Sequence, residues 1–141
     1  MTTWKGACHC GAIGYDYTTG IAPPGWSIRA CQCAFCRAHD ALSTSDPAGD
    51  IRFHCTDVSL LQRYRFALRT ADFLLCRNCG VYIGAVIESG KGRFGIINTH
   101  SLVDTPADIA DVAPISYDSE DTGGRVARRE DRWTPVSAVP W

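Results

Sequence analysis

The eight cysteines of this 141-residue chain constrain its fold more than any other feature. Seven fall into three short groups, "CHC" at 8–10, "CQCAFC" at 31–36 and "CRNC" at 76–79, and Cys55 stands alone. The first residues, "MTTWKGACHCG", lack the apolar run of a secretory signal, so we expect a cytoplasmic protein. In a reducing compartment grouped cysteines are typical of metal ligands or reactive thiols, although their even number leaves a disulfide framework open.

The segment "CRNCG" at 76–80 has the form of a metal-binding knuckle. Two cysteines separated by two residues can hold one ion, and Gly80 permits the positive φ that such a turn often requires. The apolar segments "DFLLC" and "VYIGAVI" flank the knuckle, which predicts a hairpin of the zinc-ribbon type. One knuckle supplies two ligands, whereas a closed structural zinc site has four.

The segment "CHCG" at 8–11 is the predicted source of the other two ligands. In a strand, residues i and i+2 point to the same face, which would aim Cys8 and Cys10 together. Four thiolates at about 2.3 Å from a tetrahedral zinc lie roughly 3.8 Å apart, a spacing that a same-face pair can approach. We therefore predict a structural zinc site formed by Cys8, Cys10, Cys76 and Cys79.

The remaining group, Cys31, Cys33 and Cys36, gathers three thiols by local geometry alone. Three protein ligands with a vacant fourth position are typical of catalytic zinc. Three interpretations stay open at this point: an open reactive site, a second structural site completed by His39 or Cys55, and thiols that bind no metal. Cys55 is otherwise expected to be a small buried apolar residue.

Densely spaced Gly and Pro residues divide the chain into short apolar and aromatic runs, which indicates strands joined by turns. The runs are 12–17, 26–33, 50–55, 71–76, 81–88 and 93–98. Short helices are expected at 57–65 and 106–112, with Asp57 and Thr105 as plausible starts. We predict a mainly β zinc-binding domain over 1–113 and a polar extension over 114–141, which either packs on the domain or trails from it.

The charge balance excludes some functions. Lys and Arg number 14 against 15 Asp and Glu, so the formal net charge is −1, which argues against a general nucleic-acid binder. The basic run "RVARRED" is interpreted as a solvated face. The longest apolar stretches are far too short to cross a bilayer, so no membrane role is expected.

The arrangement "GACHCGAIGYDY…CQCAFCR…LLCRNCGVYIG" resembles the family of glutathione-dependent formaldehyde-activating enzymes, which includes centromere protein V. The resemblance spans roughly residues 4–103. It implies a β-rich, Mss4-like fold with two zinc positions, one structural and one catalytic. The two cysteine sets predicted above correspond to these positions. The sequence departs from the family after Cys36, where "RAHDALS" places His39 and Asp40 beside the second set.

The resemblance implies a carbon–sulfur lyase type of reaction, in which the thiol of glutathione adds to formaldehyde or a related small electrophile. His39 is the predicted acid, with Asp40 orienting it, although a surface histidine is an equally simple interpretation. Arg29 and Arg37 are predicted to bind the glutathione carboxylates, with His100 a weaker candidate.

Two other functions are compatible with the same residues. One is a two-zinc binding module without catalysis, whose partner is another macromolecule. The other is a metal-free thiol-transfer protein that uses Cys31, Cys33 and Cys36. Exposed aromatic strands would also suit a homodimer.

Overall fold

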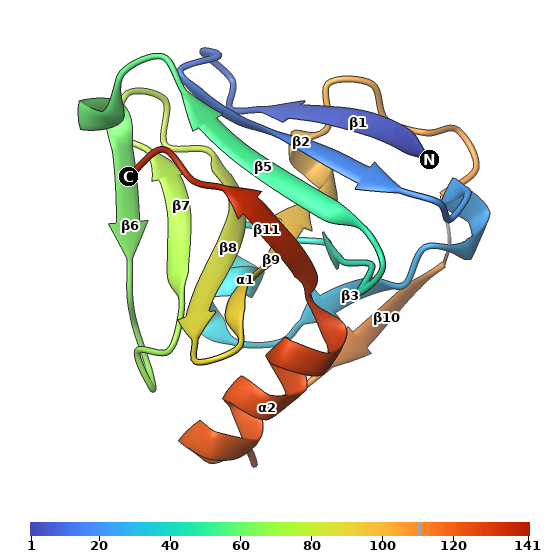
Figure 1. Ribbon diagram of the computed structural model, residues 1–141, viewed down its shortest axis with the longest axis vertical. Helices are drawn as coiled ribbons and strands as arrows, with labels where there is room; N and C mark the ends of the chain where they lie inside the picture. Colours follow the sequence, from blue (N-terminus) through green and yellow to red (C-terminus); the bar gives the residue numbers. More distant parts are fainter. Residues whose placement is uncertain (110) are drawn as a thin grey trace.

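The computed structural model describes residues 1–109 and 111–141, which form a mainly β structure with two α-helices (Figure 1). The helices are α1 (Ala34–Ala38) and α2 (Thr122–Arg132), and 3-10 turns cover 23–25, 58–60 and 99–101. The strands are β1 (Thr2–Ala7), β2 (Ile13–Thr19), β3 (Ile28–Cys31), β4 (Ser43–Thr44), β5 (Asp50–Cys55), β6 (Leu61–Tyr64), β7 (Asp72–Cys76), β8 (Tyr82–Ser89), β9 (Gly92–Asn98), β10 (Val112–Ile115) and β11 (Thr134–Ala138).

The strands join in one continuous, strongly curved sheet. Its main path runs β1-β2-β5-β11-β9-β4-β3-β10, and the meander β6-β7-β8 attaches through the pairing of β8 with β9. Most neighbours are antiparallel, whereas β10 with β3 and β11 with β5 are parallel. The curvature lets the β1-β2-β5-β11 part lie across the β6-β7-β8-β9 part (Figure 1).

The main core fills the space between these two parts of the sheet. Tyr15 and Ile51 come from one part, and Leu74, Ile83 and Ile97 from the other, and all five side chains are almost fully buried. Burying a large apolar side chain stabilises the fold by about 1.5–3 kcal/mol. The core therefore holds the two ends of the chain's cysteine pattern, β1 and the β7-β8 hairpin, in one rigid frame.

The predicted strands are confirmed. β2, β3, β5, β7, β8 and β9 each lie within or overlap one of the six apolar runs. The hairpin of β7 and β8 encloses the "CRNCG" knuckle, where Gly80 has φ +79°. β1, β4, β6, β10 and β11 come from segments that were not predicted as strands.

The predicted helices are wrong. Within 57–65 only a 3-10 turn forms, and Leu61–Tyr64 is strand β6, because it pairs with β7. In 106–112, residues 106–109 form no helix, residue 110 lies outside the described residues, and Val112 begins β10. The helices occur instead inside "CQCAFC" and in the polar extension, where the Asp121 side chain accepts from the Gly124 N–H and caps α2.

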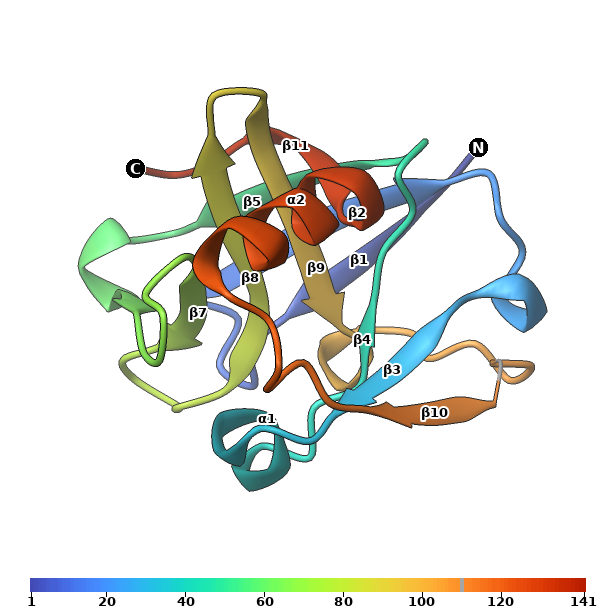
Figure 2. The ribbon, with the colours of Figure 1, turned by 90° about the horizontal axis from the view of Figure 1, so that it is seen from below.

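The segment after residue 113 packs on the body of the protein. β11 lies between β5 and β9, pairing Thr134 with Gly95 and Val136 with Ile51. α2 leads into β11 and lies over β8 and β9 (Figure 2). Trp133, between helix and strand, is 4% exposed.

Among the described residues, neither helix has the length and apolar character needed to traverse a bilayer.

Candidate metal centres and the adjoining cavity

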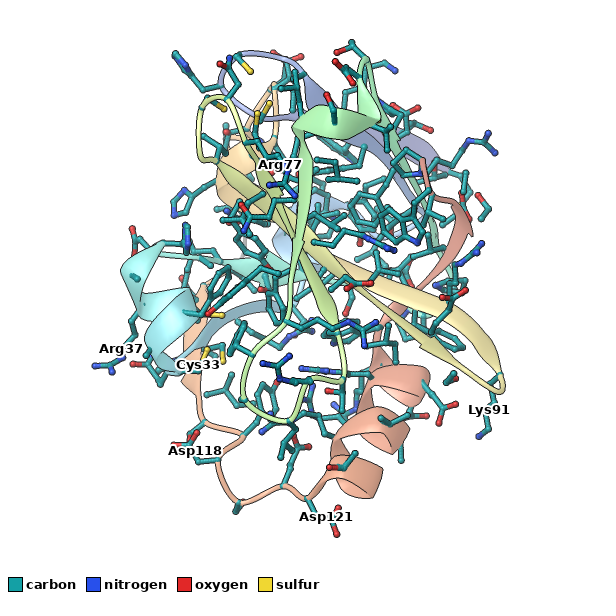
Figure 3. The ribbon with its side chains drawn as sticks, turned by 90° about the vertical axis from the view of Figure 1, so that its left-hand side faces the viewer. Cys33, Arg37, Arg77, Lys91, Asp118 and Asp121 are labelled. Carbon is teal, nitrogen blue, oxygen red and sulfur yellow. The ribbon has the colours of Figure 1, made fainter. Side chains whose placement is uncertain are left out.

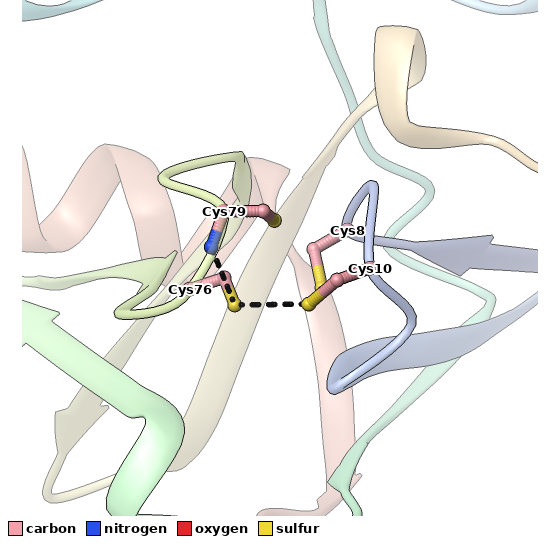
Figure 4. A group of neighbouring side chains, drawn as sticks. All are labelled: Cys8, Cys10, Cys76 and Cys79. Carbon is pink, nitrogen blue, oxygen red and sulfur yellow. Dashed lines mark hydrogen bonds between the residues drawn. The ribbon is translucent and has the colours of Figure 1, made fainter.

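Four thiols converge at one end of the sheet, as the cysteine spacing predicts. The sulfurs of Cys8, Cys10, Cys76 and Cys79 all lie within 4.8 Å of one another (Figure 4). Sγ of Cys10 is 3.8 Å from Sγ of Cys8 and 3.6 Å from Sγ of Cys76. Tetrahedral zinc–thiolate geometry requires roughly 3.8 Å between sulfurs, so this set fits a zinc ion.

Local backbone structure positions both pairs. The pair Cys8 and Cys10 lies in the turn after β1, and not in a strand as expected, with the Gly11 N–H donating to the Cys8 carbonyl at 3.1 Å. The turn brings the two sulfurs together just as a strand face would. In the knuckle, the N–H of Cys79 donates to Sγ of Cys76 at 3.5 Å. Such N–H donors stabilise the negative charge that a thiolate ligand carries.

The electrostatics of the four-thiol cluster favour a bound cation. Burial raises the pKa of Cys8 to about 11, whereas a hydrogen bond from the Asn78 side chain lowers the pKa of Cys10 to about 6. Neighbouring thiols therefore ionise far apart in pH when no cation is present. A divalent ion bound among the four thiols would allow all of them to ionise, because it favours the thiolate form of every ligand.

A second cluster of three thiols lies where β3 meets α1. Cys31 ends β3, Cys33 is the N-cap of α1, and Cys36 lies within the helix. Sγ of Cys33 accepts from the Cys36 N–H at 3.4 Å, so the residue that starts the helix also presents a ligand atom. The three sulfurs lie within 4.8 Å of one another, as predicted for a second metal position.

The pKa values of Cys31 and Cys36 are shifted in opposite directions. A hydrogen bond with Cys36 lowers the pKa of Cys31 to about 5, with a further contribution from the positive charge of Arg128. The same hydrogen bond, together with burial, raises the pKa of Cys36. One thiolate thus forms readily, whereas three together require a cation between them. The donor set fits zinc, which binds thiolates in tetrahedral sites.

No fourth side chain completes this cluster among the described residues. The group of mutually close ligand atoms contains three members, and neither His39 nor Cys55 is one of them. Cys55 ends β5 and packs against the main core instead. The second cluster therefore differs from the first in having one ligand position left for something outside the chain.

A cavity of about 300 Å³ adjoins the three thiols. Cys31, Cys33 and Cys36 form part of its lining. The rest of the wall is largely apolar, with contributions from the β6-β7 loop, β7, β9 and the residue between α2 and β11, notably Phe66, Leu68, Phe73, Ile96 and Trp133. The three-thiol cluster therefore faces this partly open cavity.

Arginines of α2 also line this cavity, which the sequence interpretation missed. Arg125, Arg128 and Arg129 occupy positions i, i+3 and i+4 and lie on one face of the helix. The interpretation of "RVARRED" as a solvated face is wrong for them, since Arg129 is only 7% exposed. The spacing of these arginines in the sequence is compatible with one face of a helix. The adjacent Gly123 and Gly124, which disfavour a helix, argued against predicting one there.

Two of these arginines share one carboxylate. Glu120 accepts from Nε of Arg128 at 2.7 Å and from Nε of Arg125 at 3.4 Å. The hydrogen bond from Arg128 lowers the pKa of Glu120. The Arg128 guanidinium also lies 3.5 Å above the ring of Tyr117. These contacts fix α2 against the 114–120 segment at the mouth of the cavity.

The structure separates the other predicted site residues. Arg29, on β3, lines the cavity and donates from Nη2 to Ser45 Oγ at 2.8 Å. Arg37 is exposed on α1 and projects outward, away from the cavity (Figure 3). His39 follows α1 and its ring packs on Phe35, with 4.5 Å between ring centroids. It does not belong to the cavity lining.

Asp40 and His100 lie beside each other on the surface. Oδ2 of Asp40 is 3.7 Å from Nε2 of His100, and the Asp40 side chain is 95% exposed. The structure therefore brings Asp40 to His100 and not to the sulfur cluster.

Fold and sites together define a zinc-binding β domain with one complete and one incomplete thiolate site, the Mss4-like arrangement. The family model described as "glutathione-dependent formaldehyde-activating enzyme" matches residues 3–119. The chain belongs to this family. The match contains all seven clustered cysteines and ends before α2.

One solved structure supports the fold. A crystal structure of a Rhodobacter sphaeroides protein from structural genomics is 29% identical, covers 79% of this chain and 99% of that one, and superposes with a TM-score of 0.61. No curated protein matches the chain.

Proposed function

We propose that this protein is a zinc-dependent enzyme of the carbon–sulfur lyase type, which adds the thiol of glutathione to formaldehyde or a related small electrophile. One observation carries the proposal: the three sulfurs of Cys31, Cys33 and Cys36, without a fourth ligand among the described residues, line a cavity of about 300 Å³. Membership of the formaldehyde-activating family supports the choice of reactants.

The three cysteine ligands determine which chemistry is favourable. Zinc bound by three thiolates carries a net charge of −1, so it acidifies water less than a three-histidine site does and is better suited to holding an incoming thiol as the reactive thiolate. The addition breaks the S–H bond of the thiol and forms one carbon–sulfur bond. The proton returns to the aldehyde oxygen, so that S-hydroxymethylglutathione is the product and no oxidant is needed.

The chain's own residues bind and orient the reactants. Arg29 lines the cavity beside the cluster and is placed to bind a glutathione carboxylate. The His39 ring packs on Phe35 outside the cavity lining, so we assign the return of the proton to water and not to His39. Arg37 and Asp40 point to the exterior, and we give neither a role in the reaction.

We also propose that the protein functions in the cytoplasm. All eight cysteines are free of disulfide bonds. Seven of them form the two clusters, in each of which the sulfurs lie within 4.8 Å of one another. Reducing conditions keep such thiols available for zinc, whereas an oxidising compartment would pair them.

Cobalt substitution tests the proposal directly. Cobalt(II) replaces zinc in thiolate sites and reports its ligands by colour. We expect glutathione at millimolar concentration to change the thiolate-to-cobalt absorption, and the zinc protein to accelerate S-hydroxymethylglutathione formation above the spontaneous rate. Cys33→Ser is the matched variant, which should lose both responses.

A cobalt spectrum that millimolar glutathione leaves unchanged would contradict the proposal. It would favour instead a two-zinc binding module whose clusters are both structural. Protein that is isolated without metal and has seven titratable thiols in its clusters would favour the thiol-transfer alternative.

A further inference from the structure

Arg129 is a buried cation without a matching anion. It is 7% exposed, and its guanidinium lies over the Trp133 ring at 4.7 Å. Nη1 donates to the hydroxyl of Thr70 at 2.6 Å, but Nε has no hydrogen-bond partner. Among residues 1–109 and 111–141, no carboxylate lies within ion-pair distance of it.

Arg129 nevertheless keeps its charge at neutral pH. Burial, followed by the neighbouring charge of Arg128, lowers the pKa of Arg129 to about 10, which is still well above 7. An unpaired charge in the interior is unfavourable, and proteins normally pair it. Glu120, the acidic group whose charge acts on Arg129, is already shared between Arg125 and Arg128. The positive charge of Arg129 is thus available to a ligand.

Arg29 adds a second cation to the same cavity. It comes from β3, whereas Arg129 comes from α2, and its partner is the hydroxyl of Ser45 at 2.8 Å. No carboxylate of the described chain is within ion-pair distance of Arg29 either. The cavity lining includes four arginines against two acidic residues, Asp118 and Glu120, so it attracts anions.

The remaining wall suits an apolar group. Phe66, Phe73 and Trp133 all line the cavity, whose volume of about 300 Å³ is at the lower end of the range for small-molecule sites. Formaldehyde has neither a charge nor a body that would use such a wall. The arginines and the aromatic residues therefore recognise another part of one of the reactants.

We propose that the cavity is a binding site for a small organic carboxylate, held by the guanidinium groups of Arg129 and Arg29 while its apolar body lies against Phe66, Phe73 and Trp133. The planar guanidinium matches a carboxylate with two parallel hydrogen bonds. Arg129 lies beyond residue 119, where the family match ends, so its part in this recognition comes from the C-terminal segment of this chain. The carboxylate site itself does not depend on the proposed function. The assignment of the carboxylate to one of the two reactants does rest on the proposed function.

Binding of benzoate to the zinc-loaded protein tests the site without any reaction. Benzamide has the same shape without the charge and is the control ligand. We expect benzoate to bind at least about tenfold more tightly than benzamide, and Arg129→Met to weaken benzoate binding by about 10- to 100-fold with little effect on benzamide. Calorimetry gives the affinities, and a change in tryptophan fluorescence, to which Trp133 in the cavity wall contributes, accompanies binding.

Matched variants separate the site from general effects of charge. Arg132 is on the same helix, and its side chain is 73% exposed. The variant Arg132→Met should leave the affinity for benzoate unchanged. Arg29→Met repeats the test with the arginine from β3 if Arg129→Met does not fold. Equal affinities for benzoate and benzamide, or a loss with Arg132→Met as large as that with Arg129→Met, would overturn the proposal.

A second set of assays identifies the reactant that carries the carboxylate. If it is the thiol, Arg129→Met raises the KM for glutathione, and the glutathione diester shows no such change. If it is the electrophile, the variant slows the reaction of glyoxylate and spares that of formaldehyde. Absence of both effects, despite activity with formaldehyde, would overturn the role of the site in the reaction. The protein could bind benzoate although glutathione leaves its cobalt spectrum unchanged. That result would support the carboxylate site and contradict the proposed function.

Discussion

The two cysteine clusters have nearly the same chemistry and different surroundings. Cys8 and Cys10 meet Cys76 and Cys79 from a hairpin 66 residues away in sequence, and the four sulfurs leave a tetrahedral ion no free position. Cys31, Cys33 and Cys36 come from one six-residue segment, and the cavity adjoins them. Metal ligands that are distant in sequence crosslink the fold, whereas ligands from one short segment can hold a metal that also binds a molecule from outside the chain.

This difference has a thermodynamic reason. A metal that joins distant segments stabilises the folded state strongly, because the unfolded chain must close a long loop to bind it. A metal held by one short segment closes little loop and contributes less to stability. The first cluster is therefore suited to a structural role, and the second can leave a coordination position open without unfolding the chain.

The largest effect is expected from Cys79→Ser. The variant should lose the structural zinc and with it part of a binding free energy that reaches about 10–16 kcal/mol in zinc-finger peptides. We expect the Tm to fall by at least about 10 °C, or no cooperative unfolding to remain. Calorimetry and metal analysis measure both quantities. A variant that keeps the wild-type Tm with one zinc fewer would show that the first cluster is not structural.

A smaller effect on stability is expected from Cys33→Ser. Serine is a favourable N-cap, so its hydroxyl can replace Sγ as the acceptor for the Cys36 N–H and preserve α1. We expect one zinc per chain instead of two, a Tm within about 3 °C of wild type, and loss of the accelerated reaction. Unfolding as severe as in Cys79→Ser would remove the distinction between the clusters.

The smallest effect is expected from Cys55→Ala. Cys55 is half-buried at the end of β5 and belongs to neither cluster. Removing its sulfur should destabilise the fold by no more than about 1 kcal/mol and leave both zinc ions in place. Metal analysis beside the two serine variants provides the comparison. Loss of a zinc here would assign Cys55 as a ligand and contradict the open second site.

Much of the strand pattern could be predicted, because apolar runs between Gly and Pro residues depend on local sequence. The 57–65 segment shows where this fails. Asp57 suggested the start of a helix there, but the pairing of Leu61 with Cys76 makes residues 61–64 a strand, since tertiary pairing outweighs a weak local preference. The helix at Ala34–Ala38 was not predicted, because its N-cap Cys33 and its one cysteine, Cys36, were interpreted only as ligands.

The same limit applies to the site. His39 and Asp40 are close to Cys36 in sequence, yet neither lines the cavity: the His39 ring packs on Phe35, and Asp40 is exposed beside His100. Arg128 and Arg129 are more than 90 residues from Cys36 and line its cavity. The spacing of the cysteines predicted the two groups of sulfurs that the structure brings together, because metal ligands have characteristic spacings, but residues around a cavity have none.

The identity and grouping of the two thiolate sets were determined by the sequence alone, since zinc geometry requires particular residue types at particular short spacings. The tertiary structure brought the four-thiol set together from two distant turns and placed the three-thiol set against the arginine-lined cavity, to which it also brought Arg29 and Arg129 from distant parts of the chain. Burial and long-range contact depend on how the whole sheet curves, and no local segment specifies that curvature.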